Sequence, residues 1–432
     1  MALILACLLD GRPFLLLPTG LPDAQSADLA AQAGCRAVFD PEGEPLAAPP
    51  LDDVPTEPLP SGTTFMLTTS GSTGRPKVVP LSGDAVAAFA AWAGPAFGLC
   101  PGVGVLNYAP LNFDLCLFDI WSSLAYGARV VLVGPKQAIR GSALLDLVLE
   151  HEVSVVQAVP MAYRLLLDAA HERGTVLRSV RHAVFTGDTM PEHTLSGMSA
   201  LLPEARMYNV YGCTETNDSF MHEYTAEEGA GGGDDPAGPS IGTPLPGVGA
   251  MVLDGRGERV EGPGSGELYV STPFQSEGYL DPARREGVFT GHPLGSDERR
   301  WYRTGDLVRR DAYGRLRLVG RADHQVKVRG VAVNTAEVER VLLAHPDVLE
   351  AGVAALPDTV AGRRLAAGVR RAPGTGLNSL TLRAYCAQYL SRAAVPGSFR
   401  ITDDALPTTS TGKIDRTALG ATPAGAHKTV TT

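Results

Sequence analysis

The sequence lacks an excess of basic residues and any long apolar run. Its 37 Lys and Arg stand against 47 Asp and Glu, a net charge of −10. This balance argues against nucleic acid as a bulk partner, because phosphate backbones attract basic faces. A helix that spans a bilayer needs about 18 or more consecutive apolar residues, and no such run occurs, so no membrane partner is expected.

Clustered cysteines are also missing. The six cysteines lie far apart without a CxxC pair, which is typical of a reducing cytoplasm and excludes a cysteine-rich metal site. The apolar stretch 1–20 has no basic start and is interrupted by Asp10 and Arg12. We therefore predict a buried helix end followed by a strand at 13–17, and not a signal peptide.

What the sequence does have is an alternation of strand-like and helical segments. Apolar runs at 129–133, 153–159 and 181–187 are separated by stretches of helical spacing, which predicts a mixed α/β fold with a parallel sheet covered on both faces. Short alternating strands between glycine and proline turns then predict a β-subdomain at about 241–322.

The pattern changes again at about residue 323. A strand, a helix, two strands and a second helix follow, long enough for a domain of their own. We predict a large N-terminal domain over 1–322 and a small α+β C-terminal domain over 323–432. The first helix of this domain has a capping residue and one apolar face: Asn334 or Thr335, then Val338, Val341 and Leu342.

The stretch "LTTSGSTGRPKVV" (67–79) is rich in hydroxyl groups and contains two glycines and a lysine. Glycines let the backbone approach a ligand, hydroxyls donate hydrogen bonds and the lysine adds a cation, so the loop suits a polyphosphate. Its glycine spacing does not match the Walker pattern, and alone it reads equally well as a surface turn. The residues in question are Thr68, Thr69, Ser70, Gly71, Ser72, Thr73, Gly74 and Lys77.

Four further stretches follow in order: "NVYGCTET" (209–216), "YRTGDL" (302–307), "GRADHQVKVRG" (320–330) and "LPTTSTGKIDRTAL" (406–419). Together with the loop they resemble the amino-acid adenylation domains of nonribosomal peptide synthetases, which are adenylate-forming enzymes. The resemblance implies ATP and Mg²⁺ as cofactors, and formation of aminoacyl-AMP with release of pyrophosphate. It also implies transfer of the aminoacyl group to the phosphopantetheine thiol of a separate carrier protein.

The resemblance assigns roles to individual residues. Lys413 would be catalytic and bridge the carboxylate and the phosphate, while the hydroxyl-rich loop would hold the β- and γ-phosphates. Arg321 is left with two readings, a contact to ribose or an ion pair. The remaining nucleotide assignments are Asp306 on the ribose hydroxyls, Tyr211 and Asn209 on adenine, Thr214 on the α-phosphate, Gly187 against the nucleotide and Glu215 on Mg²⁺.

The stretch "NFDLCLFDIW" (112–121) concerns the substrate. By resemblance Asp114 pairs with the α-ammonium group, although it could instead cap a helix, and Asp119 competes for the role. Cys116 replaces the serine that is usual in the family. The side-chain pocket would be lined by Leu115, Phe118, Gln157, Val184, Thr186, Val210, Asp218 and Ser219.

This pocket lining predicts a small or medium amino acid with a polar or basic side chain, provided that Asp218 is not simply exposed on its loop. Asp323 would be the hinge about which the C-terminal domain rotates between the two half-reactions. The resemblance also implies an N-terminal subdomain that is shortened at its start, and a small activator protein is a candidate partner. Two alternatives stay open: an acyl- or aryl-CoA ligase, and a non-catalytic nucleotide-binding remnant.

Overall fold

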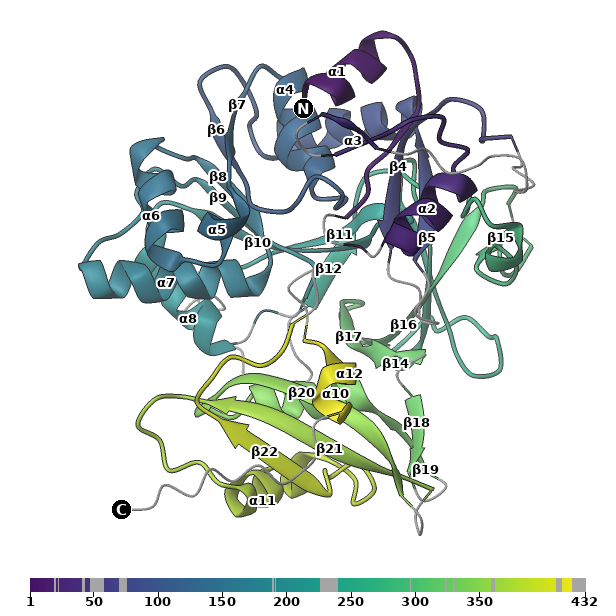
Figure 1. The fold of residues 1–432 in the computed structure, drawn as a ribbon. Coiled ribbons are helices and arrows are strands. Elements are labelled where there is room, and N and C mark those ends of the chain that lie inside the picture. Colours follow the sequence, from purple (N-terminus) through teal and green to yellow (C-terminus); the bar gives the residue numbers. More distant parts are fainter. Residues whose placement is uncertain are drawn as a thin grey trace.

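The computed structural model describes residues 1–18, 21, 23–40, 43–46, 58–69, 76–188, 190, 192–225, 240–295, 297–322, 325–328, 331–358, 362–408 and 414–421. It shows a mixed α/β protein with a large N-terminal domain and a small C-terminal domain, one below the other in Figure 1. The predicted fold class is confirmed. The predicted hinge, Asp323, lies outside the described residues.

A parallel sheet forms the middle of the large domain, as predicted. Its strands pair in the order β10-β9-β8-β6-β7, all in parallel. Neighbouring residues alternate between two core clusters, Val105 and Val155 in one, Leu106 and Val156 in the other, so both faces are buried. The strands are β6 (Gly104–Asn107), β7 (Arg129–Leu132), β8 (Val155–Ala158), β9 (His182–Phe185) and β10 (Arg206–Cys213).

Helices cover both faces of this sheet (Figure 1). Those on one face pack through the leucines and alanines of their apolar sides, and the other face is covered mainly by a long helix and a short π-helix. The first group is α6 (Gly141–Glu150), α7 (Pro160–Arg173) and α8 (Glu192–Leu201); the second is α3 (Gly83–Ala96) and η1 (Leu117–Ser122). Short connecting helices are α4 (Ser123–Ala125), α5 (Pro135–Ala138) and η2 (Pro282–Arg284).

The antiparallel strands predicted between 241 and 322 are present, and they continue the same sheet. Hydrogen bonds run from β10 through β11 and β12 to β17, β16, β14 and β13, so the large domain is built on one twelve-stranded sheet. Sequence periodicity cannot reveal this continuity, because it describes each strand and not its neighbour. The strands are β11 (Asn217–Glu223), β12 (Ser240–Pro244), β13 (Gly249–Leu253), β14 (Gly264–Ser271), β15 (Phe289–Thr290), β16 (Trp301–Arg310) and β17 (Leu316–Arg321).

The N-terminal prediction is half right. The strand appears as β1 (Phe14–Leu15), parallel to β4 (Thr63–Thr69), which pairs with β5 (Lys77–Ser82). The helix α1 (Ala2–Leu9) exists, but none of its residues is buried and Leu9 is 89% exposed, so the predicted burial is wrong. The helix is apolar all round and only Ile4 and Leu8 pack against the core. Nearby lie α2 (Asp23–Gln32), β2 (Val38–Phe39) and β3 (Pro45–Leu46).

The C-terminal domain follows the predicted order of elements. Asn334 caps α10 by accepting a hydrogen bond from the amide of Ala336, and Val338, Val341 and Leu342 are buried. Two antiparallel strands and a third, parallel one form its sheet, with α11 as the crossover. The elements are β18 (Gln325–Val328), β19 (Val331–Asn334), α10 (Thr335–Leu343), β20 (Val348–Asp358), β21 (Gly362–Arg371), α11 (Ser379–Tyr389), β22 (Ser398–Thr402) and α12 (Arg416–Ala421). In the part of the chain described above, no helix has the length and apolar character that crossing a membrane requires.

An ion pair between the buried Glu339 and the partly exposed Arg416 connects α12 to the rest of this domain. Arg416 donates to both carboxylate oxygens of Glu339, 2.7 Å from Nε to Oε1, and Glu339 also accepts the amide of Val353. Replacing Glu339 with Gln removes the charge of the buried partner and its charge-assisted hydrogen bonds to Arg416, so we expect a loss of about 2 kcal/mol in the free energy of unfolding. Urea denaturation measures it. Glu337→Gln, two residues earlier on another side of α10, serves as the control with a change below about 0.5 kcal/mol; equal effects would contradict the expectation.

Candidate active site

A cleft of about 3400 Å³ runs along the carboxyl ends of the parallel strands and between the two domains. The strands β6, β8, β9 and β10 each contribute residues at this edge: Asn107, Gln157, Thr186, Gly187, Cys213 and Thr214. The C-terminal domain adds residues of α10 and β20 and Arg416. Crevices at the carboxyl ends of parallel strands are where α/β sheets bind ligands, so this cleft is the candidate active site.

Three of the residues predicted to hold the nucleotide form one hydrogen-bonded cluster. Tyr211 donates its hydroxyl to Oδ2 of Asp306, and Arg321 donates from Nη1 to Oδ1 over 2.9 Å. Asp306 and Arg321 face each other across β16 and β17, and Asp306 is only 8% exposed. Burial, and then the charge of Asp306, raise the pKa of Tyr211 well above its usual value, so the phenol keeps its proton.

Of the two roles expected for Arg321, a contact to ribose or an ion pair, the structure shows the ion pair, which Arg321 forms with Asp306. Gly305 beside it has φ +72°, and a Cβ there would lie 3.0 Å from Nη2 of Arg321. The glycine of "YRTGDL" therefore gives the guanidinium its room. Asn209 lines the cleft and donates to the carbonyl oxygen of Ser240 over 2.8 Å. Gly187 has φ +81°, a conformation that favours glycine.

Glu215 belongs to a second cluster, which includes a residue that no motif indicated. Tyr279 donates its hydroxyl to Oε1 of Glu215 over 2.6 Å, and Thr69 donates to the same oxygen over 3.5 Å. The ammonium of Lys77 lies 4.4 Å from the centre of the Tyr279 ring, a cation–π contact. Tyr279 is buried and lines the cleft. It contacts Glu215, which lies 64 residues earlier in the chain, so no local sequence pattern could have indicated this role.

Glu215 suits Mg²⁺ only in company with other ligands. Among the described residues no group of three or more His, Cys, Asp or Glu side chains is arranged to hold a metal ion. Mg²⁺ in nucleotide sites is commonly bound by one or two carboxylates together with phosphate oxygens and water. One carboxylate at the cleft fits an ion that arrives with a nucleotide.

Several predicted residues lie outside the described part of the chain: Ser70, Gly71, Ser72, Thr73, Gly74, Asp323 and Lys413. Their described neighbours reach the cleft. Thr69 and Lys77 pair across β4 and β5, which shows that the hydroxyl-rich loop joins two antiparallel strands at the cleft. Thr408 and Ile414 form a β-bridge on either side of Lys413, and both line the cleft.

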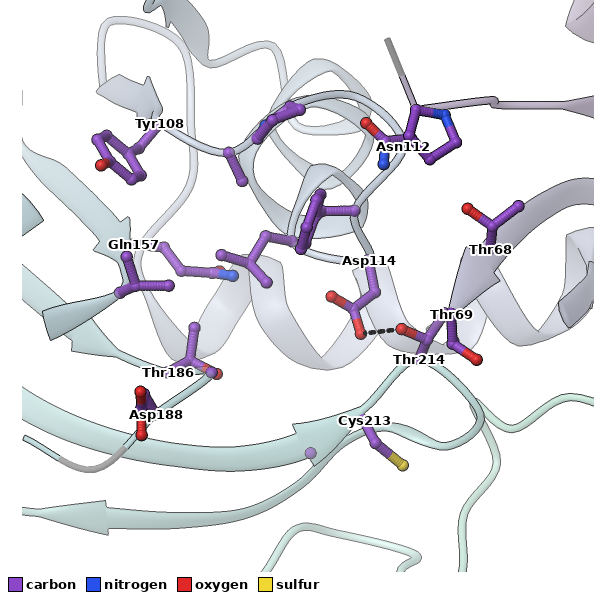
Figure 2. Close-up of a pocket in the computed structure, with 18 of the residues that line it drawn as sticks. Thr68, Thr69, Tyr108, Asn112, Asp114, Gln157, Thr186, Asp188, Cys213 and Thr214 are labelled. Carbon is purple, nitrogen blue, oxygen red and sulfur yellow. Dashed lines mark hydrogen bonds between the residues drawn. The ribbon is translucent and has the colours of Figure 1, made fainter. Parts of the chain in front are cut away.

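Asp114 stands at the substrate side of the cleft. Its Oδ2 accepts a hydrogen bond from the hydroxyl of Thr214 over 2.9 Å (Figure 2). The residue at the N-cap of the helix η1 is Cys116 and not Asp114, and its side chain makes no capping bond. Its competitor Asp119 is fully buried, accepts from Asn107 over 3.3 Å and does not line the cleft.

The predicted side-chain pocket divides into two groups. Leu115, Gln157, Thr186, Val210 and Asp218 line the cleft. Phe118, Val184 and Ser219 do not: the first two pack in the core behind the wall, and the Ser219 hydroxyl bonds the carbonyl oxygen of Asn217. Val184 lies within β9 and packs in the core, whereas Thr186 follows the end of that strand, at the carboxyl edge of the sheet where the cleft runs.

Residues 1–280 match the AMP-binding enzyme family, and residues 337–413 match the AMP-binding enzyme C-terminal domain. The chain belongs to the AMP-binding enzyme family. The two matches correspond to the large and the small domain described above. The predicted resemblance to an adenylation domain is thereby confirmed.

Similar proteins within this family include free-standing and multidomain members. The chain is 33% identical to an L-proline--[L-prolyl-carrier protein] ligase of Pseudomonas fluorescens, over 85% of this chain and 70% of that protein. It is 35% identical to a dimodular nonribosomal peptide synthase of Bacillus subtilis, over 85% of this chain but 15% of the synthase. Of a second prolyl-carrier protein ligase, from Streptomyces coelicolor, the chain spans 65% at 34% identity.

Solved structures agree on the fold of this AMP-binding enzyme. Klebsiella oxytoca NpsA in complex with 3-hydroxyanthranilyl-AMSN superposes with a TM-score of 0.80 at 24% identity, over 96% of this chain and 85% of that one. The amide bond synthetase McbA from Marinactinospora thermotolerans has the same TM-score at 25% identity, over 97% and 86%. The arrangement of a large and a small domain is therefore shared.

The complete burial of the Asp119 carboxyl group predicts an effect on stability that depends on pH. Burial raises its pKa well above the usual value, and the hydrogen bond from Asn107 offsets this only in part; among the described residues Oδ1 has no hydrogen-bond partner. A raised pKa stabilises the fold below the unfolded value of about 4, and that contribution is lost as pH rises. We therefore expect Asp119→Asn to raise the free energy of unfolding at pH 7.5 by about 1 kcal/mol, with the gain disappearing towards pH 4.

Urea denaturation at several pH values measures this effect. Asp254 is the control of opposite sign, because backbone amides of Glu258 and Arg256 lower the pKa of this exposed carboxyl. Asp254→Asn should destabilise at pH 7.5 and lose that effect as pH falls. A destabilised Asp119→Asn at pH 7.5 would show that the carboxylate is ionised and needed.

Proposed function

We propose that this enzyme activates an amino acid with Mg·ATP to aminoacyl-AMP, releasing pyrophosphate, and then transfers the aminoacyl group to the phosphopantetheine thiol of a separate carrier protein. The observation that supports this proposal best is the position of Asp114, a carboxylate at the wall of the cleft beside Thr214. A carboxylate in such a position needs a cationic partner, and the α-ammonium group of an amino acid supplies one. Aryl and fatty acids have none.

The nucleotide would lie on the other side of Thr214. The Asp306 carboxylate, held by Tyr211 and Arg321, would accept hydrogen bonds from the ribose hydroxyls, and Gly187 would let the backbone lie against the nucleotide. Asn209 and Tyr211 would contact adenine, and Thr214 the α-phosphate. Glu215 would hold Mg²⁺, which neutralises charge on the phosphates, while Thr69 and Lys77 flank the loop that would hold the leaving pyrophosphate.

In the first step a carboxylate oxygen of the amino acid attacks the α-phosphorus and the bond to pyrophosphate breaks. Both reactants are anions, so the transition state needs a fixed positive charge to stabilise it, and we assign this role to Lys413. The Glu339–Arg416 pair supports this by anchoring the chain three residues beyond Lys413. In the second step the thiol sulfur attacks the acyl carbon and AMP leaves.

These two steps would require different positions of the small domain. We propose that residues 323–432 rotate about Asp323 relative to residues 1–322, removing Lys413 after the first step. The prolyl-carrier protein ligases among the relatives support a separate carrier partner. The six cysteines are free, which favours the cytoplasm as the place of action.

Amino-acid-dependent exchange of pyrophosphate into ATP tests the proposal. Replacing Asp114 with Ala removes the partner of the α-ammonium group, and we expect at least a 100-fold lower kcat/KM with the best amino acid. Asp146→Asn is the control, because Asp146 pairs with Arg173 on the exposed side of α6. Exchange at the wild-type rate in Asp114→Ala, or exchange only with aryl or fatty acids, would overturn the amino-acid assignment.

Asp306 tests the nucleotide half of the site. Asp306→Asn keeps the shape but loses the charge that Arg321 and Tyr211 hold in place, so we expect about a 10- to 100-fold higher KM for ATP. The KM for the amino acid should change by less than about threefold, since Asp306 lies on the nucleotide side. Steady-state kinetics with each substrate varied in turn measures both values. An effect confined to the amino acid would contradict the assignment.

A further inference from the structure

Two polar side chains at the substrate side of the cleft make no hydrogen bond within the described residues. Gln157 is 3% exposed and Thr186 is 5% exposed, and both line the cleft. Figure 2 shows them bordering the same space as Asp114. Buried amide and hydroxyl groups are almost always hydrogen-bonded, so these two groups are arranged for a ligand with polar atoms at this point.

A second carboxylate borders this space. Asp218 lines the cleft on β11 directly opposite Gly212, which has no side chain to cover it. No hydrogen bond reaches its carboxylate from the described residues. Burial, and then the charge of Asp114, raise the pKa of Asp218 to about 8, and its charge in turn raises the pKa of Asp119. Asp114 and Asp119, the two groups whose charges interact with that of Asp218, are therefore both acidic.

One hairpin contacts Asp114 and carries Asp218. Thr214, between β10 and β11, donates to Asp114, and Asp218 pairs with Gly212, two residues before Thr214. Both carboxylates line the same cleft, and the charge of Asp114 raises the pKa of Asp218, so the two groups lie near each other. An ionised carboxylate binds an ammonium group at about 3 Å, so Asp114 and Asp218 can hold two ammonium groups that are only a few bonds apart.

We propose that Asp218, assisted by Gln157 and Thr186, binds a second ammonium group on the side chain of the substrate. The substrate class is then a short diamino acid, with one or two methylene groups between the α-carbon and the side-chain nitrogen, as in 2,3-diaminopropionate and 2,4-diaminobutyrate. This inference rests on the proposed amino-acid activation. The oxygen atoms of Gln157 and Thr186 would accept the remaining protons of that ammonium group.

Charge and length favour short diamino acids over aliphatic amino acids and over lysine. A neutral aliphatic side chain would cover the buried groups of Gln157 and Thr186 and the partly buried carboxylate of Asp218 without offering any of them a partner, which is costly for polar groups removed from water. The side-chain nitrogen of lysine lies four methylene groups from the α-carbon and would pass beyond Asp218. A site built for a polar group rejects an analogue that lacks it far more strongly than an apolar pocket rejects an extra methylene.

The substrate preference of the wild-type enzyme tests the proposal without any variant. In pyrophosphate exchange we expect kcat/KM for 2,4-diaminobutyrate or 2,3-diaminopropionate to exceed that for 2-aminobutyrate, homoserine, asparagine and lysine by at least about 100-fold. A preference for 2-aminobutyrate or lysine would overturn it. A preference for homoserine or asparagine would also overturn it and show that Asp218 acts as a protonated donor. If no amino acid is activated, the proposed function fails, and this inference with it.

Two variants of Asp218 test the residue itself. Asp218→Asn should lower the ratio of kcat/KM for the preferred diamino acid to that for 2-aminobutyrate by about 100-fold, and Asp218→Leu should reverse the preference. Using the ratio removes general losses of activity, and the thermal unfolding midpoint with and without ATP checks the fold. An unchanged ratio in a folded Asp218→Asn enzyme would overturn the role of Asp218.

Calorimetry gives a readout that does not depend on turnover. A bound ammonium group stabilises ionised Asp218, so a diamino acid whose side-chain nitrogen is already charged should release a proton when it binds. At pH 7, 2,4-diaminobutyrate titrated into the enzyme in two buffers of different ionisation enthalpy should show this release, and 2-aminobutyrate should not. Asp114 and Asp119 are the other acidic groups coupled to this site, so the release should disappear in Asp218→Asn. Equal release by both ligands would contradict the assignment.

Discussion

The candidate site depends on the contacts of one hairpin, β10 and β11, with three other parts of the large domain. Tyr211 bonds Asp306 on β16, Thr214 bonds Asp114 before η1, and Glu215 accepts from Tyr279. These contacts hold the nucleotide side and the substrate side at a fixed separation. A hairpin fixed at three points loses little conformational freedom when ligands bind, which favours accurate positioning of two reactants.

The two sides of the cleft carry different charged groups. On the side assigned to the nucleotide, the cations Lys77 and Arg321 accompany the carboxylates Glu215 and Asp306. On the side assigned to the amino acid lie the carboxylates Asp114 and Asp218. Carboxylates on this second side suit a substrate that brings its own ammonium group. Buried polar groups lie close to the cleft. Within the described part of the chain Oδ1 of Asp119 has no hydrogen-bond partner, and the buried side chains of Gln157 and Thr186 line the cleft.

Much of the fold could be predicted because its signals are local. The runs 129–133, 153–159 and 181–187 became β7, β8 and β9, and Asn334 caps α10 as its side chain and position suggest. The N-terminal helix was predicted as an element but not in its exposure, since apolar composition shows a tendency to be buried and not the presence of a partner. Of the predicted site, Asp114, Gln157, Thr186 and Asp218 do meet at one cleft.

The sequence by itself determined the elements, the five signature stretches and the chemical groups that they carry, because propensities, caps and motifs are properties of neighbouring residues. Only the tertiary structure decided that Tyr279 stands between Lys77 and Glu215, that Phe118 and Val184 turn into the core, and that Asp218 lies near Asp114. Each of these results joins residues that are remote in the chain. Their distances follow from how the sheet is ordered and packed, which no local pattern encodes.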